Sequence, residues 1–247
     1  RNIRVKDFVP VYQHFPGYLN PIAFSIGGFQ VRWYSLAYLT GFIVVYYLLI
    51  YRVRRDKNLS EIFNETINYK SENSIPSIQD KIKDSLIFDF LIYSFVGLII
   101  GARLGQIFFY DFGYYLQNPL AVVNPFDFNG NFVGIFGMSY FGGLIGVIVA
   151  SIFFCKTRGI NLWKWLDFVV PAIPAGYFFG RIGNLLNGEL FGKVTEKPWG
   201  MYFEDSLLRH PTQIYEALLE GLLLFVVLWI LRNKSKFSGY LVLIYLF

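Results

Sequence analysis

Stretches of apolar residues that are long enough to cross a membrane constrain this chain more than any other feature. A helix needs about 20 apolar residues to span the hydrocarbon layer, and a spanning segment must satisfy its own backbone, which favours helices. The alternating period of a β-barrel is absent from the sequence. The apolar runs are approximately Phe29–Ile50, Ile87–Tyr110, Phe132–Phe154, Leu162–Leu186 and Ile214–Leu231, and a sixth begins near Ser238. The sequence therefore predicts an all-α, polytopic integral membrane helical bundle.

Composition supports this fold class and excludes several others. Charged residues make up 16% of the chain, whereas soluble domains have about 25%, so a soluble enzyme is disfavoured. The chain has a single cysteine, Cys155, and two histidines, His14 and His210. An internal disulfide and a cysteine-rich zinc site are thereby excluded. We expect no metal and no cofactor.

The positive charges gather between the apolar runs and set the expected orientation. The stretch Asp111–Asn131 contains no Lys or Arg. The positive-inside rule places the basic segments in the cytoplasm, so the N-terminus, Asp111–Asn131 and Glu189–Pro211 are expected outside. The net charge of +5 is then a signal of topology, and no nucleic acid partner is expected. The basic residues of these segments are Arg52, Arg54, Arg55, Lys57, Lys70, Lys81, Lys83, Lys156, Arg158, Lys164, Arg232, Lys234 and Lys236.

One long polar segment, about residues 56–86, interrupts the apolar pattern. It is rich in Ser, Asn, Glu and Lys and is typical of a cytoplasmic loop with some amphipathic helix. No chemistry is assigned to it. We expect residues 1–247 to form a single membrane-embedded domain around this loop.

Charged side chains inside apolar runs cost about 2.5–3.5 kcal/mol each on insertion scales and by default indicate function. The clearest case is the run Gly180–Gly192, which reads Gly-Arg-Ile-Gly-Asn-Leu-Leu-Asn-Gly-Glu-Leu-Phe-Gly. Arg181, Asn184 and Gly188 are expected to share one helical face. The donor fork of arginine matches phosphate oxygens, and Glu189 is expected to pair with Arg181 or to act as a base. The alternative is a helix end with a snorkelling arginine.

A second polar motif begins the fifth apolar run. It is Arg209–Glu216, Arg-His-Pro-Thr-Gln-Ile-Tyr-Glu, in which proline suits the first turn of a helix. Gln213, Glu216 and Glu220 recur on one helical face. We expect a structural role for His210, because a lone histidine at a helix start is more often structural than catalytic.

Two further motifs lie in the second and third runs. Ala102–Gln106 repeats the order small, Arg, aliphatic, Gly, amide that is also found at Gly180–Asn184. Arg103 and Arg181 are therefore candidates to bind one anionic headgroup, although a chance match of five residues is the simpler explanation. Gly142–Gly146 has small residues at four-residue spacing, which predicts close helix packing.

These motifs together resemble the prolipoprotein diacylglyceryl transferase family. The run Gly180–Gly192 resembles the signature of that family. Arg32–Tyr34, Gly101–Gly105 and Met138–Gly146 resemble its first three helix motifs, and Arg209–Glu216 resembles a later one. The resemblance extends from about Pro21 to Phe247, apart from the polar loop.

The resemblance implies an enzyme of the bacterial cytoplasmic (inner) membrane with several spans. Such an enzyme moves the diacylglyceryl group of phosphatidylglycerol to the lipobox cysteine of a prolipoprotein, the first step of lipoprotein maturation. Its partners would be phosphatidylglycerol, prolipoprotein signal peptides with a lipobox, and membrane lipid. The products would be a thioether-linked lipoprotein precursor and glycerol phosphate.

The resemblance associates Arg181 with the phosphatidylglycerol headgroup and implies importance for Tyr34, Asn184, Glu189 and Gly192, and the chemistry of the reaction then suggests a role for each side chain. Arg181 and Arg103 would stabilise the charge that grows on the leaving phosphate. Asn184 and Tyr34 would orient the headgroup, and Glu189 would orient Arg181 or take the thiol proton. The expected catalytic residues are Tyr34, Arg181, Asn184 and Glu189, and the expected substrate-binding residues are Arg103, Arg181, Asn184, Asn187 and Gly192.

Two positions depart from the family pattern. The family has histidine immediately before Gly142, where this chain has Phe141, which makes Glu189 the better internal candidate for the base. The family also continues with a Tyr-Gly-x-x-Arg segment and another helix, so we expect this chain to stop before the last helix. A membrane transporter or lipid-binding protein without catalysis, and a structural assembly subunit, remain alternatives.

Overall fold

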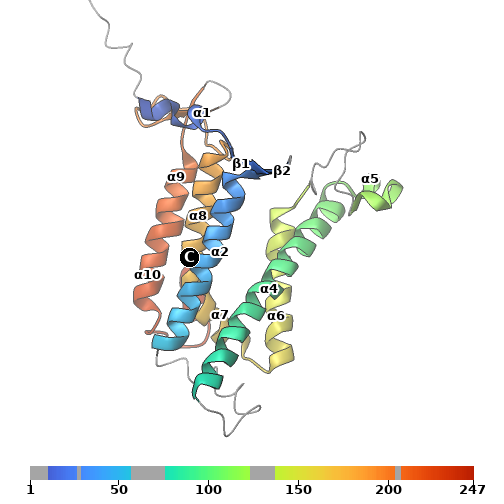
Figure 1. Ribbon diagram of the computed structural model, residues 1–247, viewed down its shortest axis with the longest axis vertical. Coiled ribbons are helices and arrows are strands. Elements are labelled where there is room, and N and C mark those ends of the chain that lie inside the picture. Colours follow the sequence, from blue (N-terminus) through green and yellow to red (C-terminus); the bar gives the residue numbers. More distant parts are fainter. Residues whose placement is uncertain (1–10, 27–28, 57–75, 123–136, 204–206) are drawn as a thin grey trace, which may run out of the picture. The chain divides into compact units, whose positions relative to one another are not determined.

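A computed structural model describes residues 11–26, 29–56, 76–122, 137–203 and 207–247. The chain forms two compact units. The first unit comprises residues 1–56 and 166–247, and the second comprises residues 57–165. Figure 1 shows the helices of both units.

Three long helical segments form the first unit (Figure 1). Helix α8 packs against α2 on one side and against the continuous segment α9–η6–α10 on the other. Gly41 on α2 and Gly176 on α8 bring two of these backbones together, because a Cβ added at Gly41 would lie 3.0 Å from the Gly176 carbonyl oxygen. The bounds are α2 Trp33–Arg55, α8 Ile173–Leu186, α9 Thr212–Glu216, the π-helix η6 Ala217–Leu223 and α10 Leu224–Leu231.

Short elements complete the first unit. Strands β1 and β2 pair as an antiparallel hairpin directly before α2, and β3 pairs with β4. The bounds are η2 Val11–His14, α1 Phe15–Tyr18, β1 Ile22–Ile26, β2 Phe29–Arg32, η5 Val170–Ala172, β3 Met201–Tyr202, β4 Leu208–Arg209 and α11 Tyr240–Leu246, and α7 Leu162–Val169 contains the boundary between the units.

The predicted spans differ from the helices in their limits. The apolar run Leu162–Leu186 is not one helix but is broken into α7, η5 and α8. The reason is proline: Pro171 and Pro174 lack an N–H and crowd the preceding turn, so each lies at the start of a new helical segment. The first predicted run also begins too early, because Phe29–Arg32 is strand β2.

The second unit is built on two long antiparallel helices, α4 (Pro76–Phe109) and α6 (Tyr140–Arg158). They approach closely through glycines, as predicted for Gly142–Gly146: a Cβ at Gly146 would lie only 2.0 Å from the Gly97 carbonyl oxygen. Helix α5 (Phe112–Gln117) and η4 (Pro119–Val122) follow α4. The third predicted run begins at Phe132, but residues 123–136 lie outside the described part, and α6 begins only after Ser139, whose hydroxyl accepts from the Gly142 N–H at 3.2 Å.

Four helices are long and apolar enough to cross a membrane within the described residues. They are Trp33–Arg55, Lys83–Phe109, Tyr140–Arg158 and Thr212–Leu231. Together with the helical fold, they identify an all-α membrane protein. Most of the polar segment 56–86 lies outside the described residues, and its end from Pro76 belongs to α4.

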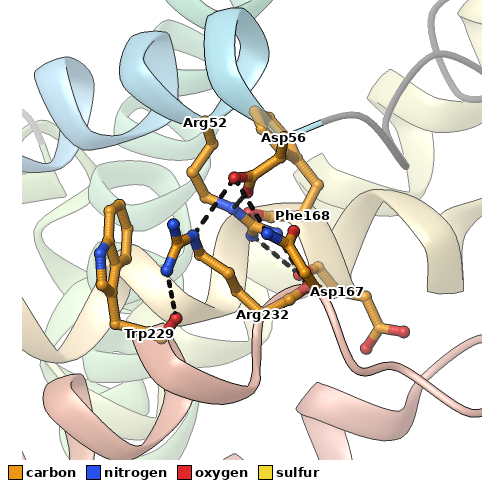
Figure 2. Close-up of polar contacts among 7 residues, drawn as sticks. Arg52, Asp56, Asp167, Phe168, Trp229 and Arg232 are labelled. Atoms are coloured by element: carbon orange, nitrogen blue, oxygen red, sulfur yellow. Dashed lines mark hydrogen bonds and ion pairs between the residues drawn. The ribbon is translucent and has the colours of Figure 1, made fainter.

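A buried polar cluster joins the C-terminal ends of α2 and α10 to α7 (Figure 2). We call Arg52, Asp56, Asp167 and Arg232 the basic-end network. Arg52 is only 1% exposed; its Nε donates to Asp56 at 2.9 Å, and its Nη1 donates to the Asp167 carbonyl at 3.1 Å and to the Phe168 carbonyl. Arg232 Nε donates to Asp56 at 3.3 Å.

The basic-end network has two consequences for the fold. Asp167 accepts from the backbone N–H groups of Gly239 at 2.7 Å and Leu241 at 2.9 Å, which fixes the start of α11. Because Arg52 Nη2 also donates to the Arg232 carbonyl at 3.4 Å, the basic ends of two spans lie on the same side of the unit. The positive-inside rule requires this arrangement.

Candidate functional site

The signature run Gly180–Gly192 forms the end of α8 and the turn that follows it. Gly188 has a left-handed backbone with φ +70°, which glycine adopts without the Cβ penalty of other residues. The Gly188 N–H donates to Leu185 O at 3.1 Å, and the Glu189 N–H donates to Asn184 O at 3.1 Å. These two bonds form a Schellman motif, which satisfies the last carbonyls of the helix.

This helix end brings two of the predicted residues together. The Asn184 side-chain amide donates from Nδ2 to Glu189 Oε1 at 2.9 Å, and Asn184 is only 4% exposed. Tyr34, in the first turn of α2, lies beside Asn184 and within electrostatic range of Glu189. Its ring packs on Tyr38 with centroids 4.6 Å apart. The structure thus groups Tyr34, Asn184 and Glu189 around one end of α2 and α8.

Arg181 lies one turn before this group and has one partner on its own helix and one on α9. Its Nη2 pairs with Glu216 Oε2 at 2.5 Å, and its Nε donates to the Tyr177 hydroxyl at 2.8 Å. The Tyr177 hydroxyl also lies 3.2 Å from Glu216 Oε2 and 2.9 Å from Glu220 Oε2. Within the described residues Arg181 Nη1 has no hydrogen-bond partner, so this end of the fork is available for an anion.

Of the two roles expected for Glu189, pairing with Arg181 is therefore wrong, because Glu216 is the ion-pair partner. The expectation that Gly188 shares a helical face with Arg181 is also wrong, since α8 ends at Leu186. Tyr177 was not identified from the sequence, although a position four residues before Arg181 faces the same side of a helix. Glu216 and Glu220 were noted on one face, but no partner was assigned to them.

A π-helix places both glutamates near Tyr177. Residues Ala217–Leu223 are wound as η6, and π-helical turns often occur at functional sites. Gly221 of this segment packs directly on α8, because a Cβ there would lie 2.9 Å from the Phe178 Cα. Close contact between the two backbones brings Glu216 and Glu220 to the hydroxyl of Tyr177.

The remaining predicted residues of the signature lie beside the same turn. Asn187 Oδ1 is buried and has no hydrogen-bond partner in the part of the chain that the structure describes. Gly192 lies against the second motif: its N–H donates to the His210 carbonyl at 2.8 Å, and a Cβ would lie 2.7 Å from Thr212 Cγ2. His210 Nδ1 lies 3.0 Å from the Tyr215 hydroxyl.

Arg103 belongs to the second unit. Its guanidinium donates to three backbone carbonyls: Ala121 at 2.6 Å, Val122 at 2.7 Å and Gly137 at 3.1 Å. It also lies over the Tyr115 ring, 5.1 Å from the centroid. These contacts tie the segment after α4 to the helix that bears Arg103.

The site lies far from the basic-end network. Tyr34 and Arg52 are at opposite ends of α2, roughly 27 Å apart along the axis at 1.5 Å per residue. Among the described residues no group of three or more His, Cys, Asp or Glu side chains is placed to hold a metal. The site instead offers an arginine fork, carboxylates, amides and phenols, which suit an anionic, hydroxylated ligand.

The fold and the site define a helical membrane protein with a charged polar site at one end of its spans. A profile described as "Prolipoprotein diacylglyceryl transferase" matches residues 21–247, and the chain belongs to this family.

Its relatives include enzymes of several bacteria. A Chlorobaculum tepidum protein is 41% identical over 246 residues, which cover 97% of this chain and 78% of that protein. A Campylobacter jejuni protein is 42% identical over 236 residues, which cover 95% of this chain and 78% of that protein. A Campylobacter hominis protein is 40% identical over 237 residues, which cover 95% of this chain and 75% of that protein. All three are named phosphatidylglycerol–prolipoprotein diacylglyceryl transferase.

Proposed function

We propose that this chain transfers the diacylglyceryl group of phosphatidylglycerol to the lipobox cysteine of a prolipoprotein. The cysteine sulfur forms a bond to the glycerol carbon, the bond between that carbon and the phosphate oxygen breaks, and glycerol phosphate leaves. The thiol proton passes to a base. Membership of the family and the names of relatives that cover most of the chain support this reaction.

The observation that most supports a phosphate-binding step is the setting of Arg181. Its guanidinium is held on one side by Glu216 at 2.5 Å and by Tyr177 at 2.8 Å, so its orientation is fixed before substrate arrives. The Nη1 group then binds the phosphate of the lipid and stabilises the charge that develops as glycerol phosphate leaves. A preorganised donor of this kind typically contributes about 10²–10³ in rate.

The other residues serve the nucleophile and the headgroup. Glu189 takes the thiol proton, with its carboxylate fixed by Asn184 at 2.9 Å, and Tyr34 lies beside this pair. Free cysteine has a pKa near 8.5, so its thiol needs a base or a positive neighbour to become a nucleophile. The unpartnered acceptor of Asn187 suits a hydroxyl of the glycerol headgroup.

Two further residues contribute to substrate binding. Gly192 lets the substrate-binding turn pack directly against α9, because a Cβ at this position would lie only 2.7 Å from Thr212 Cγ2. Arg103, in the second unit, is a candidate phosphate-binding residue in its own right, and the three carbonyls that it binds hold its side chain in one orientation.

We place the protein in the bacterial cytoplasmic membrane as a multi-pass protein whose two units act as one transferase domain. The basic ends of α2 and α10 lie together, and the site is at the other end of α2. The positive-inside rule then puts the site at the outer face, where a secreted prolipoprotein and its lipobox are accessible. The N-terminus would lie on the same side.

The test is lipidation of a lipobox peptide by the purified full-length gene product in phosphatidylglycerol vesicles. The thioether product is measured by mass spectrometry. Arg181→Ala is expected to lower the rate at least about 100-fold, whereas the control Arg55→Ala, an exposed arginine at the end of α2, keeps the wild-type rate. Lipid flux without a thioether product from the wild-type protein would refute the proposal and favour a transporter.

A further inference from the structure

The turn that bears Glu189 has an unfavourable backbone. Leu190 has φ +59° and is the one non-glycine residue with a positive φ among the described residues. For an L-residue this conformation crowds Cβ against the carbonyl oxygen, and strained backbones of this kind persist only where the surroundings hold them. The Leu190 side chain is 61% exposed, so its own packing contributes little to holding the turn.

Two side chains at the start of α9 hold this turn. Gln213 Nε2 donates to the Glu189 carbonyl at 2.7 Å, and Thr212 Oγ1 donates to the Leu190 carbonyl at 2.9 Å. Gln213 is completely buried, and its Oε1 has no hydrogen-bond partner within the described residues. Because an unsatisfied buried acceptor costs free energy, the bond from Nε2 to the Glu189 carbonyl is the favourable polar contact of the Gln213 amide.

The turn at Gly188–Leu190 also fixes the Glu189 carboxylate. Glu189 lies between the two left-handed residues Gly188 and Leu190, and its carboxylate accepts from Asn184. If the Leu190 backbone relaxed to negative φ, the Glu189–Leu190 peptide would leave the position in which Gln213 and Thr212 hold it, and Glu189 would shift relative to Asn184. Holding the two carbonyls therefore holds the carboxylate.

We propose that Thr212 and Gln213 are positioning residues, which clamp the strained turn so that Glu189 stays on Asn184. The clamp rests on the proposed function in one respect: it affects turnover because Glu189 serves the transfer reaction. Its effect on the local opening of the turn does not depend on any reaction.

The main test replaces Gln213 by methionine, which keeps the length of the side chain and removes the donor. In the lipidation assay kcat is expected to fall about tenfold, equivalent to one lost hydrogen bond, while KM for phosphatidylglycerol stays within about twofold. Thr212→Val should act in the same direction, and Thr212→Ser, which keeps the hydroxyl, should retain most of kcat. A kcat for Thr212→Ser as low as the kcat for Thr212→Val would contradict the clamp.

A second substitution separates the clamp from general damage. Leu190→Gly removes the penalty for positive φ, so the turn no longer depends on the clamp. Leu190→Gly alone should keep the wild-type kcat, and Gln213→Met with Leu190→Gly should recover most of what Gln213→Met loses. A double variant that stays as slow as Gln213→Met would overturn the inference.

A readout without catalysis distinguishes the clamp from the proposed function. Lys193 is exposed just beyond the turn, so tryptic cleavage after Lys193 in detergent micelles measures how often the turn opens. Gln213→Met should be cut there several-fold faster than wild type. If the wild-type protein forms no thioether but the cleavage difference is found, the reaction is wrong and the clamp stands; equal cleavage of wild type and Gln213→Met refutes the clamp.

Discussion

Replacing Arg52 by methionine removes the cation at the centre of the basic-end network (Figure 2). Methionine keeps most of the apolar volume but cannot donate to Asp56 or to the carbonyls of α7 and α10. Asp56 is 6% exposed and would keep only longer contacts, at 3.3 Å to Arg232 and 3.4 Å to Asn233. The variant therefore leaves a buried carboxylate without its main partner.

The expected loss of stability follows from this burial. Breaking one side of a buried ion pair costs about 3–5 kcal/mol. For a chain of this size each kcal/mol lowers Tm by about 2–4 °C, so Arg52→Met should lower Tm by roughly 6–20 °C. Arg55→Met is the matched control, because Arg55 is exposed and carries the same charge. An exposed substitution of this kind changes stability by about 0.5 kcal/mol or less.

Tryptophan fluorescence during heating in detergent micelles is a suitable assay. Trp229 lies under the guanidinium of Arg232, with 4.6 Å between the Arg232 Cζ and the ring centroid, so it reports on this end of the first unit. Adding Asp56→Asn to Arg52→Met removes the stranded carboxylate and should recover part of the lost Tm. If Arg52→Met melts within about 2 °C of Arg55→Met, the buried network does not stabilise the fold and the reasoning fails.

Three further predictions concern the second unit. Cys155 is 2% exposed near the basic end of α6, so Cys155→Ser should keep the lipidation rate; loss of product would implicate this thiol in the reaction. Phe141 is 65% exposed. Because the proposed base is a carboxylate, Phe141→His should change kcat by less than about tenfold. A larger gain in kcat would show that the wild-type site lacks a histidine base. Gly146→Ala should lower Tm because its Cβ would meet Gly97 O at 2.0 Å, an overpacking that costs about 1–3 kcal/mol. Gly113→Ala is the control, since nothing lies within 4 Å of its Cβ, and equal Tm values for the two alanine variants would contradict the close packing.

Local patterns in the sequence were sufficient for much of the fold. Length and hydropathy predicted the spans that became α2, α4, α6 and the α9–η6–α10 segment. The glycine spacing at Gly142–Gly146 predicted the close approach of α4 and α6. The basic segments predicted that the ends of α2 and α10 share one side. Each of these properties depends on residues within a few turns of one another, so the sequence alone determines them.

The sequence could not decide which charged groups meet. The sequence predicts for Arg52 only that its positive charge lies at the cytoplasmic end of a span. In the structure its side chain is buried and donates to backbone carbonyls at the ends of α7 and α10. The sequence leaves Glu189, eight residues after Arg181, either as the ion-pair partner of Arg181 or as a base, but Arg181 pairs with Glu216 on another helix. Gln213 was seen on a helical face with Glu216, but nothing in the sequence indicated that it holds the Glu189 carbonyl.

The difference has a physical cause. Helix formation, membrane insertion and glycine packing depend on local composition and periodicity, which the sequence displays directly. The partner of a buried charge or amide is instead the group that helix packing places within about 3 Å, and the prolines of the fourth run and the π-helix at Ala217–Leu223 both alter that packing. The sequence determined a membrane-spanning helical chain and the family signature at Gly180–Gly192, and only the tertiary structure decided how Arg181 and Glu189 are held.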